Sequence, residues 1–276
     1  MAGTLYVVAT PLGNLGDLSP RAAATLTAVA AVAAEDTRHT RPLLTHVGSR
    51  AELISFHAHS GDAQLRRILD LLGAGTDVAL VTDAGTPLVS DPGVALVAAA
   101  RARDIPVVTI PGPTAVAAAL AVSGLAADRY LFLGFLPRKG ADRRRLLETA
   151  AGSEWTVVLF EAPNRVAELL ADLAAACGAD RRAAVSRELT KVFEETRDGT
   201  LADLAGYYAE TPARGEVTVV VAGAGKAAPP APDESDVRTR ATALLAGGLS
   251  RRDAADQIAE ELGISRKAAY RVVNEL

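Results

Sequence analysis

The chain is poor in cysteine, methionine, tryptophan and aromatic residues in general. Among its 276 residues it has one Cys, one Met and one Trp, and aromatic side chains make up 4% of it. The single cysteine, Cys177, cannot form a disulfide within the chain, and its apolar surroundings predict a small buried side chain. With so few aromatic rings, small and β-branched residues are left to form the core, which favours close packing of helices on a sheet.

An excess of charge of one sign is also lacking. The 29 Lys and Arg against 33 Asp and Glu give a net charge of −4, so any affinity for RNA must come from local basic patches. The apolar fraction of 49% excludes a disordered chain. No Lys or Arg precedes the N-terminal apolar run, and the stretches 22–34 and 114–127 are too short and interrupted to span a bilayer. The sequence therefore predicts a cytoplasmic protein without a membrane segment.

Short β-branched runs alternate with longer Ala- and Leu-rich helical patterns. In the first half this alternation predicts a mostly parallel sheet with helices on both faces. After residues 124–128 the pattern restarts, which predicts a second α/β domain with a parallel or mixed sheet. The predicted strands are 4–9, 32–35, 77–82, 105–110, 130–134, 155–160, 182–187 and 216–222. The predicted helices are 20–32, 62–72, 93–101, 113–122, 143–149, 165–176 and 201–209.

The predicted domains are an N-terminal α/β domain at 1–115, a second α/β domain at 116–226, a linker at 227–235 and a tail at 236–276. The linker is rich in Pro and Ala and lacks hydrophobic periodicity, so it should be extended. Three helical patterns in the tail have the spacing of a helix-turn-helix. Ser250 and Ser265 are its predicted N-caps, and Gly263 suits the residue that ends a helix.

Three loops rich in Gly and Pro follow three of the predicted strands: ATPLGNLGD (9–17), VTDAGTPLVSDPG (81–93) and IPGPTA (110–115). The carboxyl ends of parallel strands meet at one edge, where ligands bind. There Asp83 could accept hydrogen bonds from a ribose or an amino group, and Gly85 would let a ligand approach the backbone. Ordinary turn-rich loops without a ligand are the alternative. None matches the dinucleotide fingerprint or the P-loop, which disfavours nicotinamide and nucleoside-triphosphate enzymes.

Two polar blocks, EDTRH and RELTK, directly follow two other strands. Ionisable groups at the ligand-binding edge are candidates for proton transfer and charge stabilisation. Glu35 and Asp36 rank first as proton acceptors, while Arg38 and Lys191 would steer phosphate or lower the pKa of a hydroxyl. A structural ion-pair cluster is the alternative. The candidate catalytic residues are Glu35, Asp36, Arg38, Glu188 and Lys191.

One segment concentrates positive charge, and its cations suit neutralisation of an RNA backbone, which is salt-sensitive and independent of sequence. A solvated helix face is the alternative. The candidate RNA-binding residues are Arg138, Lys139, Arg143, Arg144 and Arg145. The basic residues of the tail are offset by acidic ones, so RNA binding, packing and dimer formation stay open there. No metal site is predicted, because His57 and His59 have no Cys or regularly spaced carboxylates to complete one.

Eight sequence blocks resemble those of the ribosomal RNA small subunit methyltransferase I family, a branch of the tetrapyrrole methylase superfamily. They run in order from Thr4 to about Ala222, and the tail resembles that family's C-terminal extension. AAEDTRHT and RELTK separate this branch from the enzymes that methylate tetrapyrroles. TPLGNLGD stands where the porphyrinoid enzymes usually carry G-x-G-P-G-D, which argues against a tetrapyrrole substrate. The blocks are ATPLGNLGDLSPRA, AAEDTRHT, VTDAGTPLVSDPG, PGPTA, FLGFLPRK, FEAPNR, SRELTK and GEVTVVV.

This resemblance implies S-adenosylmethionine bound in a cleft between the two α/β domains. It also implies methyl transfer to the ribose 2′-hydroxyl of a cytidine in the decoding region of small-subunit (16S) ribosomal RNA, and a homodimer. Two other functions stay open: methylation of a porphyrin-like intermediate, which predicts neither the basic segment nor the tail, and a non-catalytic RNA-binding protein built around the tail. The cofactor contacts implied by the motifs are Leu12, Asp83, Gly85, Thr86, Pro87, Thr114, Ala115, Phe160, Glu161, Gly215, Glu216 and Val217.

Overall fold

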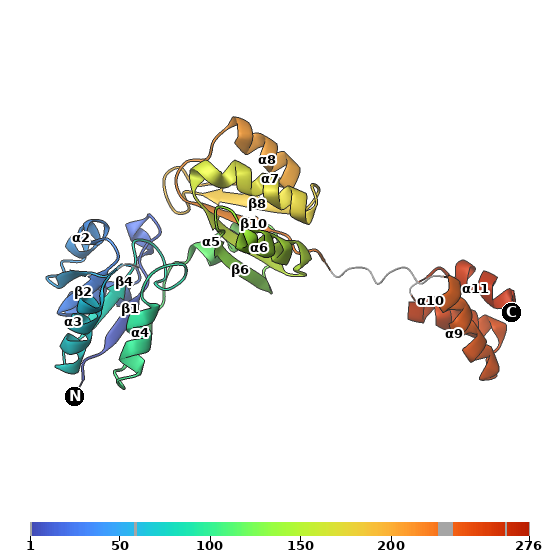
Figure 1. Cartoon of the computed structure of the whole chain (residues 1–276), viewed down its shortest axis with the longest axis horizontal. Coiled ribbons are helices and arrows are strands. Elements are labelled where there is room, and N and C mark those ends of the chain that lie inside the picture. Colours follow the sequence, from blue (N-terminus) through green and yellow to red (C-terminus); the bar gives the residue numbers. More distant parts are fainter. Residues whose placement is uncertain (1, 58–59, 226–233, 263, 276) are drawn as a thin grey trace. The chain divides into compact units, whose positions relative to one another are not determined.

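The chain divides into two compact units, Met1–Gly225 and Lys226–Leu276. A computed structural model describes residues 2–57, 60–225, 234–262 and 264–275. In these described residues, the first unit contains two five-stranded sheets with their helices, and the second contains three helices (Figure 1). Two α/β sheets and a helical C-terminal extension were predicted from the sequence, and this fold class is confirmed.

The first sheet is parallel throughout, with strand order β3-β2-β4-β1-β5. Helices α3 and α4 pack on one face, and α1 and α2 pack on the other. Its central strands are therefore covered on both faces, and all four residues of β4 are buried. The elements are β1 (Leu5–Val8), α1 (Pro20–Ala28), β2 (Ala31–Ala34), α2 (Thr37–His46), β3 (Glu52–Ser55), α3 (Asp62–Gly73), β4 (Val78–Val81), α4 (Val94–Arg101) and β5 (Val107–Ile110).

The largest differences from the predicted elements of this domain are a shorter first helix and two additional elements. Ser19 caps α1 as expected, since its hydroxyl accepts a hydrogen bond from the Ala22 N–H at 3.1 Å. The predicted helix 20–32 is too long, because Val29 is extended and the chain enters β2 at Ala31. Helix α2 and strand β3 were not predicted.

The second sheet is mixed, with strand order β6-β7-β10-β8-β9. Only the β6–β7 pair is parallel, and the other three pairs are antiparallel. Helices α6, α7 and α8 cover one face and α5 covers the other. The elements are α5 (Ala115–Val122), β6 (Tyr130–Phe135), α6 (Ala141–Gly152), β7 (Thr156–Glu161), α7 (Val166–Cys177), β8 (Arg182–Arg187), β9 (Glu195–Thr200), α8 (Leu201–Glu210) and β10 (Val217–Val221), with short 3-10 turns η1 (Leu15–Asp17) and η2 (Pro163–Arg165).

Helix α5 links the two halves of the first unit. It follows the loop after β5, yet Val116, Ala119 and Leu120 pack against Val158 and Val220 of the second sheet. The loop that precedes α5 is thereby held where the two sheets meet. The predicted domain boundary between residues 115 and 116 falls at the start of this helix and stays a prediction.

The second unit is a small three-helix cluster with its own apolar core. Helices α9 (Glu234–Ala246), α10 (Arg251–Leu262) and α11 (Arg266–Asn274) bury residues such as Ala241, Ile258 and Val273 completely. Ser250 and Ser265 accept hydrogen bonds from backbone N–H groups at the starts of α10 and α11, as predicted. Helix α9 begins within the predicted linker, whose residues 227–233, like Gly263, lie outside the described residues. None of the described helices is long and apolar enough to cross a membrane.

Candidate functional site

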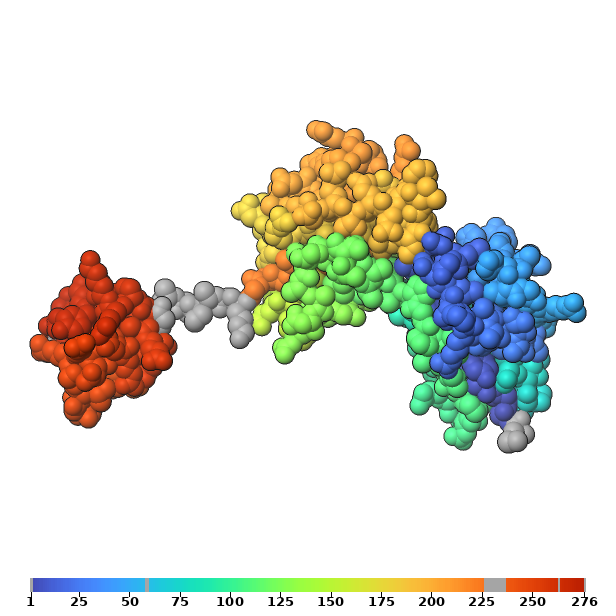
Figure 2. Space-filling model, turned by 180° about the vertical axis from the view of Figure 1, so that it is seen from behind, coloured from blue at the N-terminus to red at the C-terminus, as the bar shows by residue number. Residues whose placement is uncertain are grey.

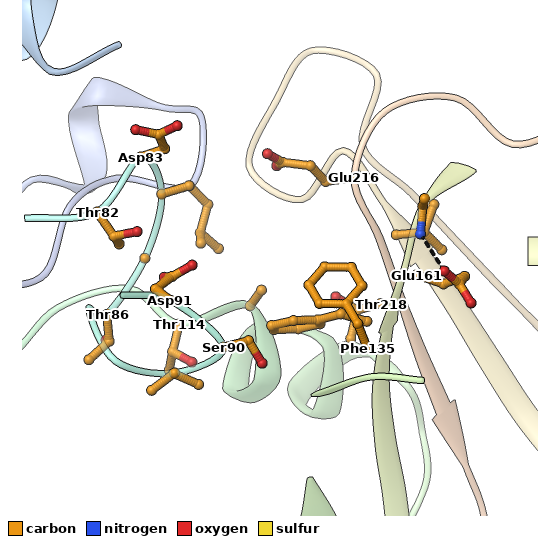
Figure 3. Close-up of a pocket in the computed structure, with 18 of the residues that line it drawn as sticks. Thr82, Asp83, Thr86, Ser90, Asp91, Thr114, Phe135, Glu161, Glu216 and Thr218 are labelled. Atoms are coloured by element: carbon orange, nitrogen blue, oxygen red, sulfur yellow. Dashed lines mark hydrogen bonds between the residues drawn. The ribbon is translucent and has the colours of Figure 1, made fainter. Parts of the chain in front are cut away.

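A cavity of about 440 Å³ lies where the strand ends of the first sheet meet the second sheet. Its volume falls within the range typical of small-molecule sites. Figure 3 shows Thr82, Asp83, Asp91 and Thr114 on one side of the cavity. Glu216 and Phe135 lie on the other side. The cavity is formed by loops after β1, β2, β4 and β5 together with the ends of β6, β7 and β10. This is the strand edge at which the sequence places a ligand.

Nearly all the residues expected to contact a cofactor line this cavity. The exception is Pro87, which is buried and does not belong to the lining, so its contact with a cofactor stays a prediction. The expected residues that line the cavity are Leu12, Asp83, Gly85, Thr86, Thr114, Ala115, Phe160, Glu161, Gly215, Glu216 and Val217.

The loop after β4 forms the wall on the side of the first sheet. Gly85 has φ +82 and pairs with Thr10 through two backbone hydrogen bonds of 2.8 and 3.1 Å. Leu88 and Ser90 also have positive φ values, 74 and 68, although neither is a glycine. Non-glycine residues in this region are strained and cluster at ligand sites, where the surrounding structure holds them in place.

Asp83 joins this loop to the polar block after β2. One of its carboxylate oxygens accepts the Asp36 N–H at 3.1 Å, and the other lies 2.9 Å from His39 Nδ1. This hydrogen bond raises the pKa of His39. Each carboxylate oxygen has a further lone pair, so Asp83 can still accept a hydrogen bond from a ligand in the cavity.

Asp91 is a lining residue for which the sequence predicted only a structural role in the loop. Burial raises its pKa to about 6, and the carboxylates of Glu35, Asp83 and Glu216 add to the shift. A pKa that is raised by burial and by nearby charges in a cavity is typical of ligand-binding sites. The motif VSDPG placed Asp91 near the site, but which groups surround it depends on contacts between the two sheets.

We expect the raised pKa of Asp91 to appear in the pH dependence of stability. In the unfolded chain this carboxyl has a pKa near 3.8 and in the folded chain about 6, so the folded state binds more protons and wild-type stability falls as pH rises across that window. Asp91→Asn should therefore be more stable than wild type above pH 6, and the advantage should vanish below about pH 4. Urea unfolding at several pH values measures this difference, and a difference independent of pH would contradict the assignment.

The two acids of the first polar block have different environments. Glu35 lines the cavity, and its carboxylate accepts a hydrogen bond from Thr82 Oγ1 at 2.8 Å. The carboxylate of Asp36 caps α2 by accepting the Arg38 N–H at 2.8 Å and also pairs with the Arg38 guanidinium. That side-chain hydrogen bond holds the pKa of Asp36 well below its usual range. Such a weakly basic carboxylate is a poor proton acceptor, so the geometry favours Glu35 over Asp36 and gives Arg38 a partner within its own block.

The second polar block organises the opposite wall. Lys191 Nζ lies 3.0 Å from Glu188 Oε1 and 3.2 Å from Glu216 Oε2. The ammonium group of Lys191 lowers the pKa of Glu188, whose carboxylate also accepts the Glu216 N–H. Glu216 lines the cavity whereas Glu188 and Lys191 do not. These two residues therefore hold Glu216 in place.

Aromatic rings form the apolar part of the second wall. Phe160 meets Phe135 edge to face, with ring centroids 5.6 Å apart, and both line the cavity. Phe135 was not predicted as a site residue, although it directly follows the predicted strand 130–134 and begins the motif FLPRK. Glu161 turns its carboxylate toward its own chain (Figure 3): it accepts the Ala162 N–H at 2.8 Å and pairs with Arg165. Glu161 therefore lines the cavity without directing its carboxylate into it.

The basic segment begins three residues after Phe135, which lines the cavity. Arg138, Lys139, Arg144 and Arg145 are exposed. Arg143 is buried, and its guanidinium pairs with Asp172 at 2.7 Å and donates to the Pro137 carbonyl at 3.0 Å. The expectation that Arg143 binds RNA is therefore corrected: its helical position turns it inward against α7.

No group of three His, Cys, Asp or Glu side chains among the described residues could hold a metal ion. His59, one member of the histidine pair noted in the sequence, lies outside the described residues. Cys177 is half-buried, and burial raises the pKa of its thiol.

Comparison with known proteins gives consistent matches along most of the chain. Residues 4–205 match the family of tetrapyrrole (corrin/porphyrin) methylases. A protein of Synechocystis sp. named ribosomal RNA small subunit methyltransferase I is 46% identical over 99% of this chain and 98% of its own length. A protein of Xylella fastidiosa with the same name is 50% identical over 97% and 98%.

Solved structures of tetrapyrrole-modifying enzymes share the fold. Cobalt precorrin-4 methyltransferase matches 79% of this chain and 94% of its own, with a TM-score of 0.63 and 18% identity. Uroporphyrin-III C-methyltransferase of Thermus thermophilus, in complex with S-adenosylhomocysteine, matches 80% and 98%, with a TM-score of 0.59 and 18% identity. At these identities the likeness concerns the fold alone.

Proposed function

Because the chain belongs to the tetrapyrrole (corrin/porphyrin) methylase family and, within it, to the ribosomal RNA small subunit methyltransferase I group, we propose that it methylates small-subunit ribosomal RNA with S-adenosylmethionine as the methyl donor. The observation that carries the proposal is the cavity between the two sheets, lined by the loops that resemble this family. The finer proposal is that the acceptor is the ribose 2′-hydroxyl of a cytidine in the decoding region, and that the enzyme works as a homodimer.

The lining of the cavity fits S-adenosylmethionine. The carboxylates of Asp83, Asp91 and Glu216 face a space that a ligand with a sulfonium and an ammonium group would fill favourably. Phe135 and Phe160 offer apolar contact for an adenine ring. Gly85 lets the ligand approach the backbone between Leu12 and the Pro113 carbonyl.

The protein's contribution to the reaction is alignment and proton acceptance. When bound, S-adenosylmethionine supplies a methyl group on a sulfonium, whose C–S bond electrons return to sulfur as the methyl leaves. The loops after β4 and β5 would align the acceptor oxygen with that methyl group, an effect worth up to about 7–11 kcal/mol in the best intramolecular cases. As the new C–O bond forms, the hydroxyl proton would pass to Glu35, the acid of the first block that lines the cavity.

The test is transfer of labelled methyl groups to small ribosomal subunits from cells that lack the gene. Nuclease digestion of the labelled RNA then locates the methyl group. Label on a single cytidine ribose is the expected result. Label on a porphyrin-like acceptor and none on the subunits would contradict the proposed RNA substrate but not the fold or the methyl donor.

The exposed cations of the basic segment predict a salt-dependent contribution to RNA binding. Arg138→Ala and Lys139→Ala should each weaken binding of the subunit and lower the slope of log K against log salt by roughly 0.7–0.9 per lost phosphate contact. Binding titrations at several salt concentrations measure this slope. Arg143→Ala is the contrasting variant: it should reduce stability through the loss of the Asp172 pair and leave the slope unchanged. Equal slopes for wild type and all three variants would show that this segment does not contact the RNA.

A further inference from the structure

The loop of residues 188–194, here called the rim hairpin, joins β8 to β9 beside the cavity. At its tip Val192 is 93% exposed and Phe193 is 73% exposed, more than the 55% of Phe135 inside the cavity. Single exposed apolar residues are common on protein surfaces. Phe193 differs from such scattered residues because its aromatic ring is exposed at the tip of a well-ordered loop beside a candidate site.

The rim hairpin consists of two successive turns. The Lys191 N–H donates to the Glu188 carbonyl at 3.0 Å, and the Glu194 N–H donates to the Lys191 carbonyl at 3.1 Å. Glu188 and Thr190 have φ values of 52 and 67, a conformation unfavourable for residues other than glycine. The Glu194 carboxylate accepts the Thr190 N–H at 2.6 Å. Strained residues of this kind persist where the structure fixes them and cluster at functional sites.

Lys191 fixes the tip to one residue of the cavity wall and to the loop after β1. Its Nζ pairs with Glu216, a lining residue. Its aliphatic stem lies against Gly13, where an added Cβ would come within 2.4 Å of Lys191 Cγ. In Figure 2 the gold segment of the second sheet's domain accordingly abuts the dark blue N-terminal segment. Val192 and Phe193 directly follow this lysine, so the exposed ring is held at the mouth of the cavity.

Resting on the proposed function, we propose that Phe193 stacks on an unpaired RNA base next to the nucleotide whose ribose enters the cavity. Proteins that act on one nucleotide of an RNA recognise unstacked bases, and aromatic side chains provide the surface on which such bases stack. Lys191, the cation next to the tip, is already paired with the carboxylates of Glu188 and Glu216, which disfavours a phosphate there, whereas stacking requires no positive charge. A second copy of the chain would need about 800 Å² on each partner, and a two-residue tip does not supply that area.

The experiment compares full-length variants with small ribosomal subunits as substrate. Phe193→Ala should raise the KM for the subunit about 10-fold, with kcat and the Kd for S-adenosylmethionine unchanged. Phe193→Trp should restore the KM because it restores an aromatic surface. Val192→Ala is the matched control, since it shortens a neighbouring apolar side chain that is even more exposed and has no aromatic ring, and its KM should stay within about twofold of wild type. Sedimentation velocity of each variant monitors its assembly state.

The outcomes separate this inference from the proposed function. If wild type transfers methyl groups to the subunit but Phe193→Ala has an unchanged KM, stacking is wrong and the proposed function stands. If Phe193→Ala and Val192→Ala raise the KM equally and both shift sedimentation toward a smaller species, the tip is a protein interface and the inference is overturned. If wild type transfers no methyl group to the subunit, the proposed function fails and this inference fails with it.

Discussion

Gly85→Val should raise the Kd for S-adenosylmethionine at least about 100-fold, a loss of roughly 2.7 kcal/mol of binding free energy. Gly85 has φ +82, and an added Cβ would lie 3.2 Å from Leu12 Cδ2 and 3.7 Å from the Pro113 carbonyl oxygen. A branched side chain at this position would therefore push Leu12 and fill the space of the ligand. Isothermal titration calorimetry with S-adenosylmethionine measures the Kd directly.

The control for backbone strain is Gly48→Val. Gly48 has a similar φ of +68, but an added Cβ there would meet nothing within 4 Å. Both variants should lose roughly 1–3 kcal/mol of unfolding free energy from the unfavourable backbone conformation, and only Gly85→Val should lose cofactor affinity. Gly85→Ala, the milder variant, should fall between wild type and Gly85→Val. Equal affinity in all three variants would mean that the loop after β4 does not contact the cofactor.

Most of the first sheet could be predicted because its strands carry their signal locally. A run such as VALV in β4 is apolar at every position, and a parallel strand covered on both faces requires that pattern. The elements that were not predicted lack such a local apolar pattern. Helix α2 is polar and contains Pro42, which normally argues against a helix interior. Strand β9 reads ETRDGT and has no buried residue, because it lies at the edge of its sheet.

Only those parts of the candidate site that directly follow individual strands could be predicted from the sequence. The loops after β1, β4 and β5 were placed at one edge because parallel strands bring their carboxyl ends together. Phe135, Asp91 and Thr218 complete the cavity through contacts between sheets, which no local pattern specifies. Arg143 is a similar case, since only its position on α6 relative to α7 distinguishes it from its two basic neighbours.

The largest catalytic effect is expected for Glu35→Gln, which should lower kcat about 100-fold or more, the contribution typical of a positioned base. Glutamine keeps the length of the side chain and an oxygen that can accept the Thr82 hydroxyl, so the change removes chiefly the capacity to take a proton. The Kd for S-adenosylmethionine should change only slightly. Single-turnover rates at saturating cofactor and subunit isolate this step from binding and product release.

Asp36→Asn is the matched control for Glu35→Gln. Asparagine caps a helix as well as aspartate does, so the start of α2 and its contact with Asp83 should persist. Because the Arg38 pair already keeps the pKa of Asp36 far below its usual range, loss of this acid should leave kcat within a few-fold of wild type. A large fall for Asp36→Asn with a small fall for Glu35→Gln would reverse the assignment. Unchanged rates in both would show that alignment of the two substrates suffices, with water accepting the proton.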